Sequence, residues 1–186
     1  MKTLTDKGFT LIELIVGIML ISVAVLFFTN VLQNSNRFVA DPWHQVRASE
    51  LGAAMMNEIL AKSFDENSSR TGGLIRCSSA DLNALDCTSP SQLGPDTGES
   101  DRSLFDDVDD YHNFTASGDA VVSLNIASNS DLEAGYEAFN VSVSVFYDAN
   151  FDAIADSTIG QFKLIQITIT DPLGHQTRFA SYKGNY

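Results

Sequence analysis

The chain has 186 residues, which is enough for one compact domain with an appendage and short for two full hydrophobic cores. Hydrophobic residues make up 44% of the chain and charged residues 19%, so the composition excludes a wholly disordered protein. Asp and Glu outnumber Lys and Arg by 24 to 11, and the net charge of −13 argues against a nucleic-acid partner, because phosphate binding needs clustered cations. Two cysteines and three histidines are too few for most structural zinc sites, so the sequence favours oxygen ligands for any metal.

An apolar segment near the amino terminus predicts a membrane-spanning helix over residues 9–32. Between Phe9 and Phe28 the clearly polar residues are only Thr10, Glu13 and Ser22. About 20 apolar residues, each rising ~1.5 Å, cross the ~30 Å hydrocarbon core of a bilayer. Two lysines lie in residues 1–8, and positive charge before an apolar segment holds the amino end on the cytoplasmic side. We therefore expect the rest of the chain to lie outside the cytoplasm.

A secretory signal peptide also has a basic start and an apolar centre, but two features argue against one. No small-x-small cleavage site follows Phe28, and Glu13 lies inside the apolar segment. A carboxylate in hydrocarbon costs about 2.5 to 3.5 kcal/mol on insertion scales, so Glu13 needs a partner. The plain alternative is a single-pass anchor in which this glutamate has no role.

The sequence Gly-Phe-Thr-Leu-Ile-Glu at residues 8–13 closely resembles the processing site of type IV pilins and the related pseudopilins. The resemblance implies a leader peptide of residues 1–8 and a prepilin peptidase that cuts between Gly8 and Phe9 and methylates the new amino terminus. The α-amino group of Phe9 would then lie four residues before Glu13. In a filament, the buried carboxylate of one subunit would pair with the buried amine of a neighbour, so that each charge offsets the desolvation of the other.

The same resemblance implies partners and a location. The partners are other pilin subunits, contacted through the amino-terminal helix, the prepilin peptidase and an inner-membrane assembly platform. Before assembly the protein would span the inner membrane once with its carboxy-terminal domain in the periplasm, and afterwards it would form part of an extracellular pilus.

An amphipathic pattern continues the helix over residues 33–62. Its apolar residues recur at spacings of three to five and predict a stripe that lies on a globular domain: Val39, Trp43, Val46, Leu51, Met55 and Ile59. Pro42 lies within this pattern and removes one backbone donor. The sequence leaves open whether the proline kinks one helix or separates two.

Residues 63–118 are rich in Ser, Gly, Asp, Asn and Pro and predict a largely irregular region or a set of short elements. Cys77 and Cys87 lie within it. Because we expect this part of the chain in an oxidising compartment, we predict that they form a structural disulfide, which would stabilise the domain by about 2 to 3 kcal/mol.

The acidic segment 105–112, with the sequence Phe-Asp-Asp-Val-Asp-Asp-Tyr-His, has two interpretations. A run of like charges is more often a solvated surface loop than a calcium or partner site, and we expect the former.

Residues 119–186 predict the antiparallel β-sheet of the globular domain. One strand is predicted at 121–126, and the alternating residues of 139–147 and 165–170 predict two more, each with one buried face. The turn residues Asp-Pro-Leu-Gly at 171–174 lead into a returning strand at 176–182. The fold class is therefore α+β: a long amino-terminal helix, half membrane-spanning and half amphipathic, packed on a small antiparallel sheet, which is a pilin-like arrangement.

A candidate calcium loop follows the strand that ends at Tyr147. Asp148, Asn150, Asp152 and Asp156 occupy the first, third, fifth and ninth positions of an EF-hand-type loop. Ala153 replaces the usual glycine, and Ile159 stands where the bidentate acid would be. The sequence therefore leaves two interpretations open, a weak calcium site and a polar turn between two strands, and it favours the polar turn.

The sequence contains no nucleophile elbow, phosphate-binding glycine loop or zinc-protease helix, so we do not expect an enzyme. Further resemblances, at residues 58–66, 105–112 and 165–186, indicate minor pilins of the mannose-sensitive haemagglutinin pilus. They imply a minor subunit that primes or joins an adhesive type IV filament. A pseudopilin of a type II secretion system is the alternative, and an ordinary membrane-anchored binding domain is a third interpretation.

Overall fold

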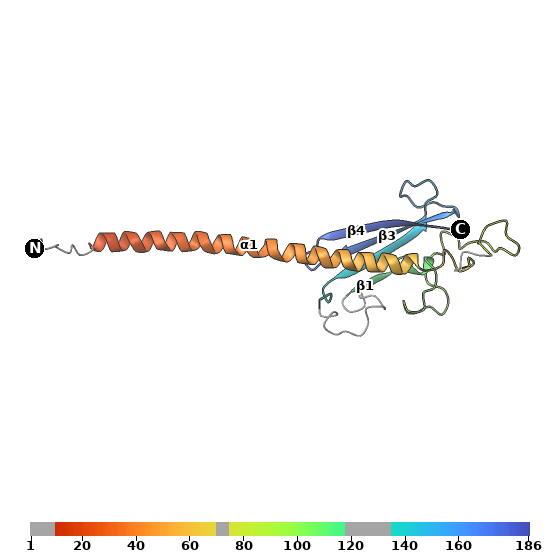
Figure 1. The fold of residues 1–186 in the computed structure, drawn as a ribbon, viewed down its shortest axis with the longest axis horizontal. Coiled ribbons are helices and arrows are strands. Elements are labelled where there is room, and N and C mark those ends of the chain that lie inside the picture. Colours follow the sequence, from red (N-terminus) through yellow and green to blue (C-terminus); the bar gives the residue numbers. More distant parts are fainter. Residues whose placement is uncertain (1–9, 70–74, 118–134) are drawn as a thin grey trace, which may run out of the picture. The chain divides into compact units, whose positions relative to one another are not determined.

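The computed structural model describes residues 10–69, 75–117 and 135–186, and over 33–41 it describes the helix without its side chains. Contacts divide the chain into two units, residues 1–43 and residues 44–186. Figure 1 shows the elements: helix α1 (Leu11–Leu60), the 3-10 helix η1 (Asp109–Tyr111) and the strands β1 (Thr115–Ser117), β2 (Asn140–Tyr147), β3 (Phe162–Thr170) and β4 (Gln176–Gly184). The predicted α+β fold class, with its pilin-like combination of a long helix and an antiparallel sheet, is confirmed.

Helix α1 continues through Pro42 without a break in its assignment. The sequence left open whether Pro42 lies within one helix or separates two, and the structure shows one helix. The loss of a single backbone donor at Pro42 does not end this helix. The helix ends at Leu60, two residues before the predicted end, where the N–H groups of Ala61 and Lys62 still donate to carbonyls of the last turn.

The first unit contains the apolar part of α1. Residues 11–32 have a mean hydropathy of 2.8, and none of this span is buried within the chain. A helix of 22 residues is about 33 Å long, so it matches the thickness of a bilayer core. This segment therefore needs lipid or other helices to cover it.

In the second unit, the end of α1 packs on the sheet through a narrower apolar stripe than the sequence predicted. Leu51, Met55 and Ile59 are buried as expected, together with Ala48. Trp43 and Val46, however, are 58% and 53% exposed, so their predicted place in the packed stripe is wrong. Instead, His44 and Arg47 make the first contacts of the helix with the domain, through Phe139 and Tyr136, and full burial begins at Ala48.

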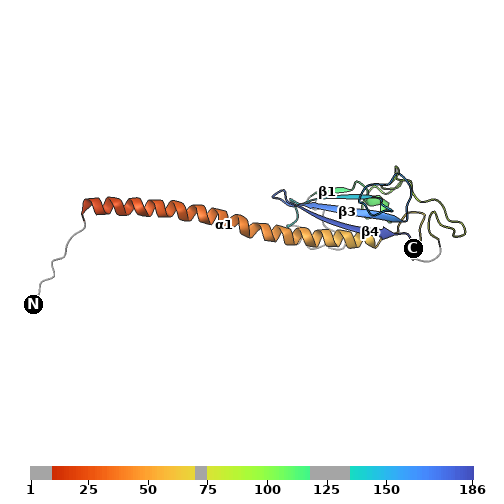
Figure 2. The same cartoon turned by 90° about the horizontal axis from the view of Figure 1, so that it is seen from above.

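The close approach of helix and sheet depends on a glycine. A Cβ atom at Gly52 would lie 2.0 Å from the ring of Phe179, a residue of β4. The absence of a side chain at Gly52 therefore lets the aromatic ring lie directly against the helix backbone. Figure 2 shows this part of α1 running beside the strands.

The sheet is an antiparallel meander with the strand order β1, β2, β3, β4. In β2 and just before it, every second residue from Phe139 to Tyr147 is buried, and in β3 Ile165, Ile167 and Ile169 are buried, so the predicted inward faces are confirmed. The turn after β3 closes with a bond from Gly174 N–H to the Asp171 carbonyl, and Gly174 has a φ of +86°. The strand predicted at 121–126 lies outside the described residues, and β1 was not predicted.

Candidate functional site

The first site is the amino-terminal end of α1. Thr10 precedes the helix, and its Oγ1 accepts the backbone N–H of Glu13 at 3.4 Å. This is one half of a capping box, because Thr at the cap and Glu three residues later satisfy free N–H groups of the first turn. The Thr-x-x-Glu spacing is visible in the sequence, but the sequence analysis did not use it.

Glu13 lies in the first turn of α1, and its side chain is exposed among exposed apolar neighbours such as Leu11, Ile12 and Leu14. A carboxylate in this turn is stabilised by the positive end of the helix dipole. Gly8 and Phe9, the predicted processing residues, lie outside the described residues. Their cleavage and the pairing of Glu13 stay predictions.

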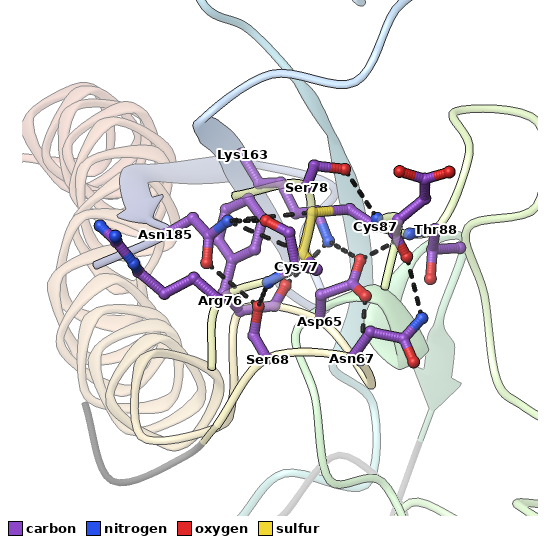
Figure 3. The surroundings of a disulfide bond; sticks show 12 residues. Asp65, Asn67, Ser68, Arg76, Cys77, Ser78, Cys87, Thr88, Lys163 and Asn185 are labelled. Carbon is purple, nitrogen blue, oxygen red and sulfur yellow. Dashed lines mark hydrogen bonds and ion pairs between the residues drawn. A yellow bond between two sulfur atoms is a disulfide. The ribbon is translucent and has the colours of Figure 1, made fainter. Parts of the chain in front are cut away.

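The predicted disulfide is present between Cys77 and Cys87. Figure 3 shows the side chains around it, which come from distant parts of the chain. Asn185 donates from Nδ2 to the Cys77 carbonyl at 3.0 Å, and Ser68 Oγ links Cys77 N–H to Asn185 Oδ1. The disulfide therefore anchors the carboxy-terminal tail to the otherwise irregular region after α1.

The acidic segment is not the solvated loop that the sequence analysis favoured. Asp107, Asp109 and Asp110 are each no more than 3% exposed. Their oxygens accept backbone bonds of the turn itself: Asp107 Oδ1 accepts the N–H groups of Asp109 and Asp110, and Asp110 Oδ2 accepts those of Asp106 and Asp107. The carboxylates thus shape the backbone around η1, which a count of charges does not reveal.

Burial has a clear electrostatic consequence in this segment. Removal from water, reinforced by the neighbouring carboxylates of Asp109 and Asp110, raises the pKa of Asp107 to about 8. Burial also raises the pKa of Glu99 to about 7, with a further contribution from its hydrogen bond to Asp110. Carboxylate oxygens of Glu99, Asp106 and Asp110 lie within 4.8 Å of one another. Oxygen donors in such a group suit a hard cation, and protonation is the other way to relieve their repulsion.

The four residues of the candidate calcium loop lie in the β2–β3 connection, where their oxygens accept hydrogen bonds within the domain. Asp148 Oδ1 accepts Asp152 N–H, while its Oδ2 accepts Ala153 N–H and the Tyr182 hydroxyl. Asp152 Oδ2 accepts the Asn150 amide, and Asp156 Oδ2 accepts Ala149 N–H. Burial alone would raise the pKa of Asp148, but these donors hold it below its usual range.

The loop has the backbone of a calcium loop in one respect. Ala153 stands at the glycine position and has a φ of +62°, the left-handed conformation that glycine normally supplies. Among the described residues, the carboxylates of this loop do not form a group within 4.8 Å like the one around Glu99. Calcium binding here stays a prediction.

The sequence analysis missed a cluster of buried charges around Lys163. The Lys163 ammonium lies 3.0 Å from Asp65 Oδ2 and 2.5 Å from Asp109 Oδ1. The signal was in the strand pattern, because alternation places Lys163 on the same face as the buried Ile165 and Ile167. A second buried pair, Arg102 with Glu58, ties the irregular region to α1.

Residues 4–29 match the family model described as the prokaryotic N-terminal methylation motif. No curated protein and no solved structure matches the chain. This motif is typical of type IV pilin-like and pseudopilin proteins, which are generally structural subunits without enzymatic activity. In proteins with this motif, prepilin peptidase cleaves the chain, and the apolar helix anchors the subunit in a membrane before it assembles with other pilins into a filament.

Proposed function

We propose that this chain is a minor pilin of a type IV pilus of the mannose-sensitive haemagglutinin type. It is trimmed at the inner membrane while its globular domain lies in the periplasm, and it then primes or joins an extracellular filament that adheres to surfaces. One observation carries the assignment to a processed, assembling subunit: the processing motif at residues 8–13 leads into an exposed apolar helix with one carboxylate in its first turn.

The exposed apolar helix explains why the subunit must be held either in a membrane or in a filament. Side chains such as Ile12, Ile15 and Phe27 are more than half exposed, and about 25 cal/mol is gained for each Å² of apolar surface removed from water. In a membrane, lipid covers this surface, and in a filament, the helices of neighbouring subunits replace the lipid. Packing of helices therefore holds the filament together, while Glu13 selects the axial position of each subunit.

The assignment to this type of pilus rests on resemblance in the globular domain. The segments that carry it are residues 58–66, 105–112 and 165–186, which contribute the end of α1, the buried acidic turn and the last two strands. Residues of these segments are buried and hydrogen-bonded within the globular domain, which is the part of the subunit that would be displayed on the filament. Adhesion is the role that the resemblance implies for it.

A pseudopilin of a type II secretion system is the second candidate. The observation that favours it is the loop at residues 148–156, whose left-handed Ala153 and hydrogen-bonded Asp148 match the start of a calcium loop. The two candidates share processing and assembly. Genes beside this one that encode secretion components rather than pilus components would favour the second.

Mass spectrometry of the mature amino terminus tests the proposal. Protein from a cell with prepilin peptidase should lack residues 1–8 and begin with methylated Phe9. Gly8→Ser should keep the leader. Gly17→Ser is the matched control, because Gly17 lies within α1 with open space around it, and this variant should be trimmed normally. A wild-type chain that retains residues 1–8, or a Gly8→Ser chain that loses them, would contradict the proposal.

A further inference from the structure

Lys163 lies fully enclosed at the start of β3, beside the disulfide. Its side chain and that of Asp65 have no exposed surface, and that of Asp109 is 3% exposed. The ammonium nitrogen donates to the Phe64 carbonyl at 2.8 Å as well as to the two carboxylates. Figure 3 shows Asp65 next to the disulfide, with bonds to Lys163, Asn67 and Thr88. One amine and two carboxyl groups therefore share a site without access to bulk water.

Aromatic rings complete the enclosure. The Lys163 nitrogen lies 4.3 Å from the centre of the Phe64 ring and 4.9 Å from that of Tyr147. The Tyr147 hydroxyl donates to the Thr88 carbonyl at 2.8 Å, which fixes the ring in place. An amine held between two rings has little freedom to leave the carboxyl groups that it contacts.

The two carboxyl groups differ in their hydrogen bonds. Asp65 accepts the N–H of Asn67 on Oδ1 and the N–H of Thr88 on Oδ2, so both its oxygens are used. Asp109 uses Oδ1 for Lys163, but its buried Oδ2 has no hydrogen-bond partner within the described residues. Burial raises the pKa of Asp109 to about 7 against the opposing effect of Lys163. At neutral pH, Asp109 is therefore often the protonated member of the pair.

We propose that Lys163 and Asp109 condense to an intramolecular isopeptide bond, with Asp65 as the proton carrier. The lysine first gives a proton to its carboxylate neighbours, and its free electron pair attacks Cγ of the protonated Asp109. The new C–N bond forms, the bond from Cγ to the unpartnered oxygen breaks, and Asp65 passes the proton from nitrogen to the leaving hydroxyl. One water molecule leaves, nothing is oxidised or reduced, and no further reactant is required.

The enclosure favours this reaction over a plain ion cluster. If both carboxyl groups were ionised beside one ammonium, an excess negative charge would be left in a site without water, which is costly to bury, and protonation of Asp109 relieves it. Condensation replaces one of the two ion pairs by a neutral amide. The enclosure also holds the amine and the carboxyl group at contact distance, so that the two groups react within one molecule without first having to meet. The link would join β3 to η1 next to the disulfide, so two covalent bonds would close the same part of the domain.

Intact-mass spectrometry of the full-length chain, purified in detergent and reduced, tests the proposal. The wild-type mass should be lower than the sequence mass by one water molecule, after allowance for processing. Lys163→Arg and Asp109→Ala should each restore the full mass of their sequence. Lys183→Arg is the control, because Lys183 donates to the Leu60 carbonyl outside this site, and this variant should still lack one water.

Peptide mapping of the wild-type chain makes the test independent of whether the variants fold. A proteolytic digest should contain a branched peptide joining the segments around Lys163 and Asp109. Asp65→Ala should leave the two segments separate, because the proton carrier is gone. A wild-type chain with its full mass and separate peptides would overturn the proposal, and a branch at Asp65 instead of Asp109 would overturn the assignment of roles.

Discussion

At the scale of single residues, buried ion pairs join parts of the domain that lie far apart in the sequence: Lys163 contacts Asp65 and Asp109, and Arg102 contacts Glu58. The roles of Glu13 and of the cysteine pair could be predicted from the sequence. An acid in an apolar segment is usually functional, and two cysteines outside the cytoplasm usually form a disulfide. The acidic segment around Asp109 was assigned to a solvated loop on its charge count. Its burial depends on Lys163, more than 50 residues away, and on the hydrogen bonds of its own backbone, which no local pattern contains.

Asp107 leads to a prediction about pH. Because its pKa is raised to about 8 in the folded state, the folded chain binds this proton more tightly than the unfolded chain. Its contribution to stability is therefore present at acid pH and is lost as the pH rises from about 4 to about 8. Asp107→Asn keeps an oxygen for the N–H groups of Asp109 and Asp110 and carries no charge. We expect its stability advantage over wild type to be about 1 to 3 kcal/mol larger at pH 8 than at pH 5.

Chemical denaturation of the full chain across this pH range measures the effect. Asp101→Asn is the control, because hydrogen bonds from Ser103 lower the pKa of Asp101. Loss of the Asp101 carboxylate should therefore leave the change in stability between pH 5 and pH 8 as it is in wild type. Parallel pH profiles for wild type and Asp107→Asn would show that Asp107 does not titrate in this range.

At the scale of elements, the regular strands were predictable because each buries one face. The alternation in β2 and β3 and the turn at 171–174 together specify the register, since a shift by one residue would turn every Ile of β3 outward. Strand β1 was missed because three residues, Thr-Ala-Ser, carry no alternation to detect. The stripe of α1 was overestimated at Trp43 and Val46, because the spacing of apolar residues predicts one face of a helix but not which of its residues the domain covers.

The β2–β3 connection carries a prediction about calcium. If residues 148–156 bind calcium, Asp152 must give up its hydrogen bond from the Asn150 amide and bind the ion instead. We expect a Kd of about 1 mM, because the acid at the twelfth position of the loop is missing. Calorimetry of the full chain should detect this binding, and Asp152→Ala should weaken it about tenfold or more. Asp86→Ala, which alters another acidic residue, should leave it unchanged. Absence of heat at several millimolar calcium would leave the segment as a polar turn.

At the scale of the whole molecule, the two units solve different physical problems. The globular unit buries its own apolar residues and closes its irregular region with a disulfide and buried ion pairs. The helix from Leu11 to Leu32 buries almost nothing within the chain, so its partners must come from outside. The exposure of this helix was predictable, because a continuous apolar segment is the strongest signal in the sequence. The loops between the regular elements were not, because their conformations depend on contacts with distant residues such as Asn185.

Glu13 provides the test of how the helix assembles. Glu13→Gln keeps the size and much of the polarity of the side chain, but it leaves the amine of the neighbouring Phe9 without a counter-charge in an apolar surrounding. Because removal of one partner of a buried pair costs several kcal/mol, we expect incorporation into filaments to fall at least about tenfold, with membrane insertion unchanged. Ser22→Ala is the control, since the Ser22 hydroxyl already donates to the Ile18 carbonyl of its own helix. The measurement is the ratio of protein in sheared filaments to protein in membranes, and equal ratios for Glu13→Gln and wild type would exclude the pairing.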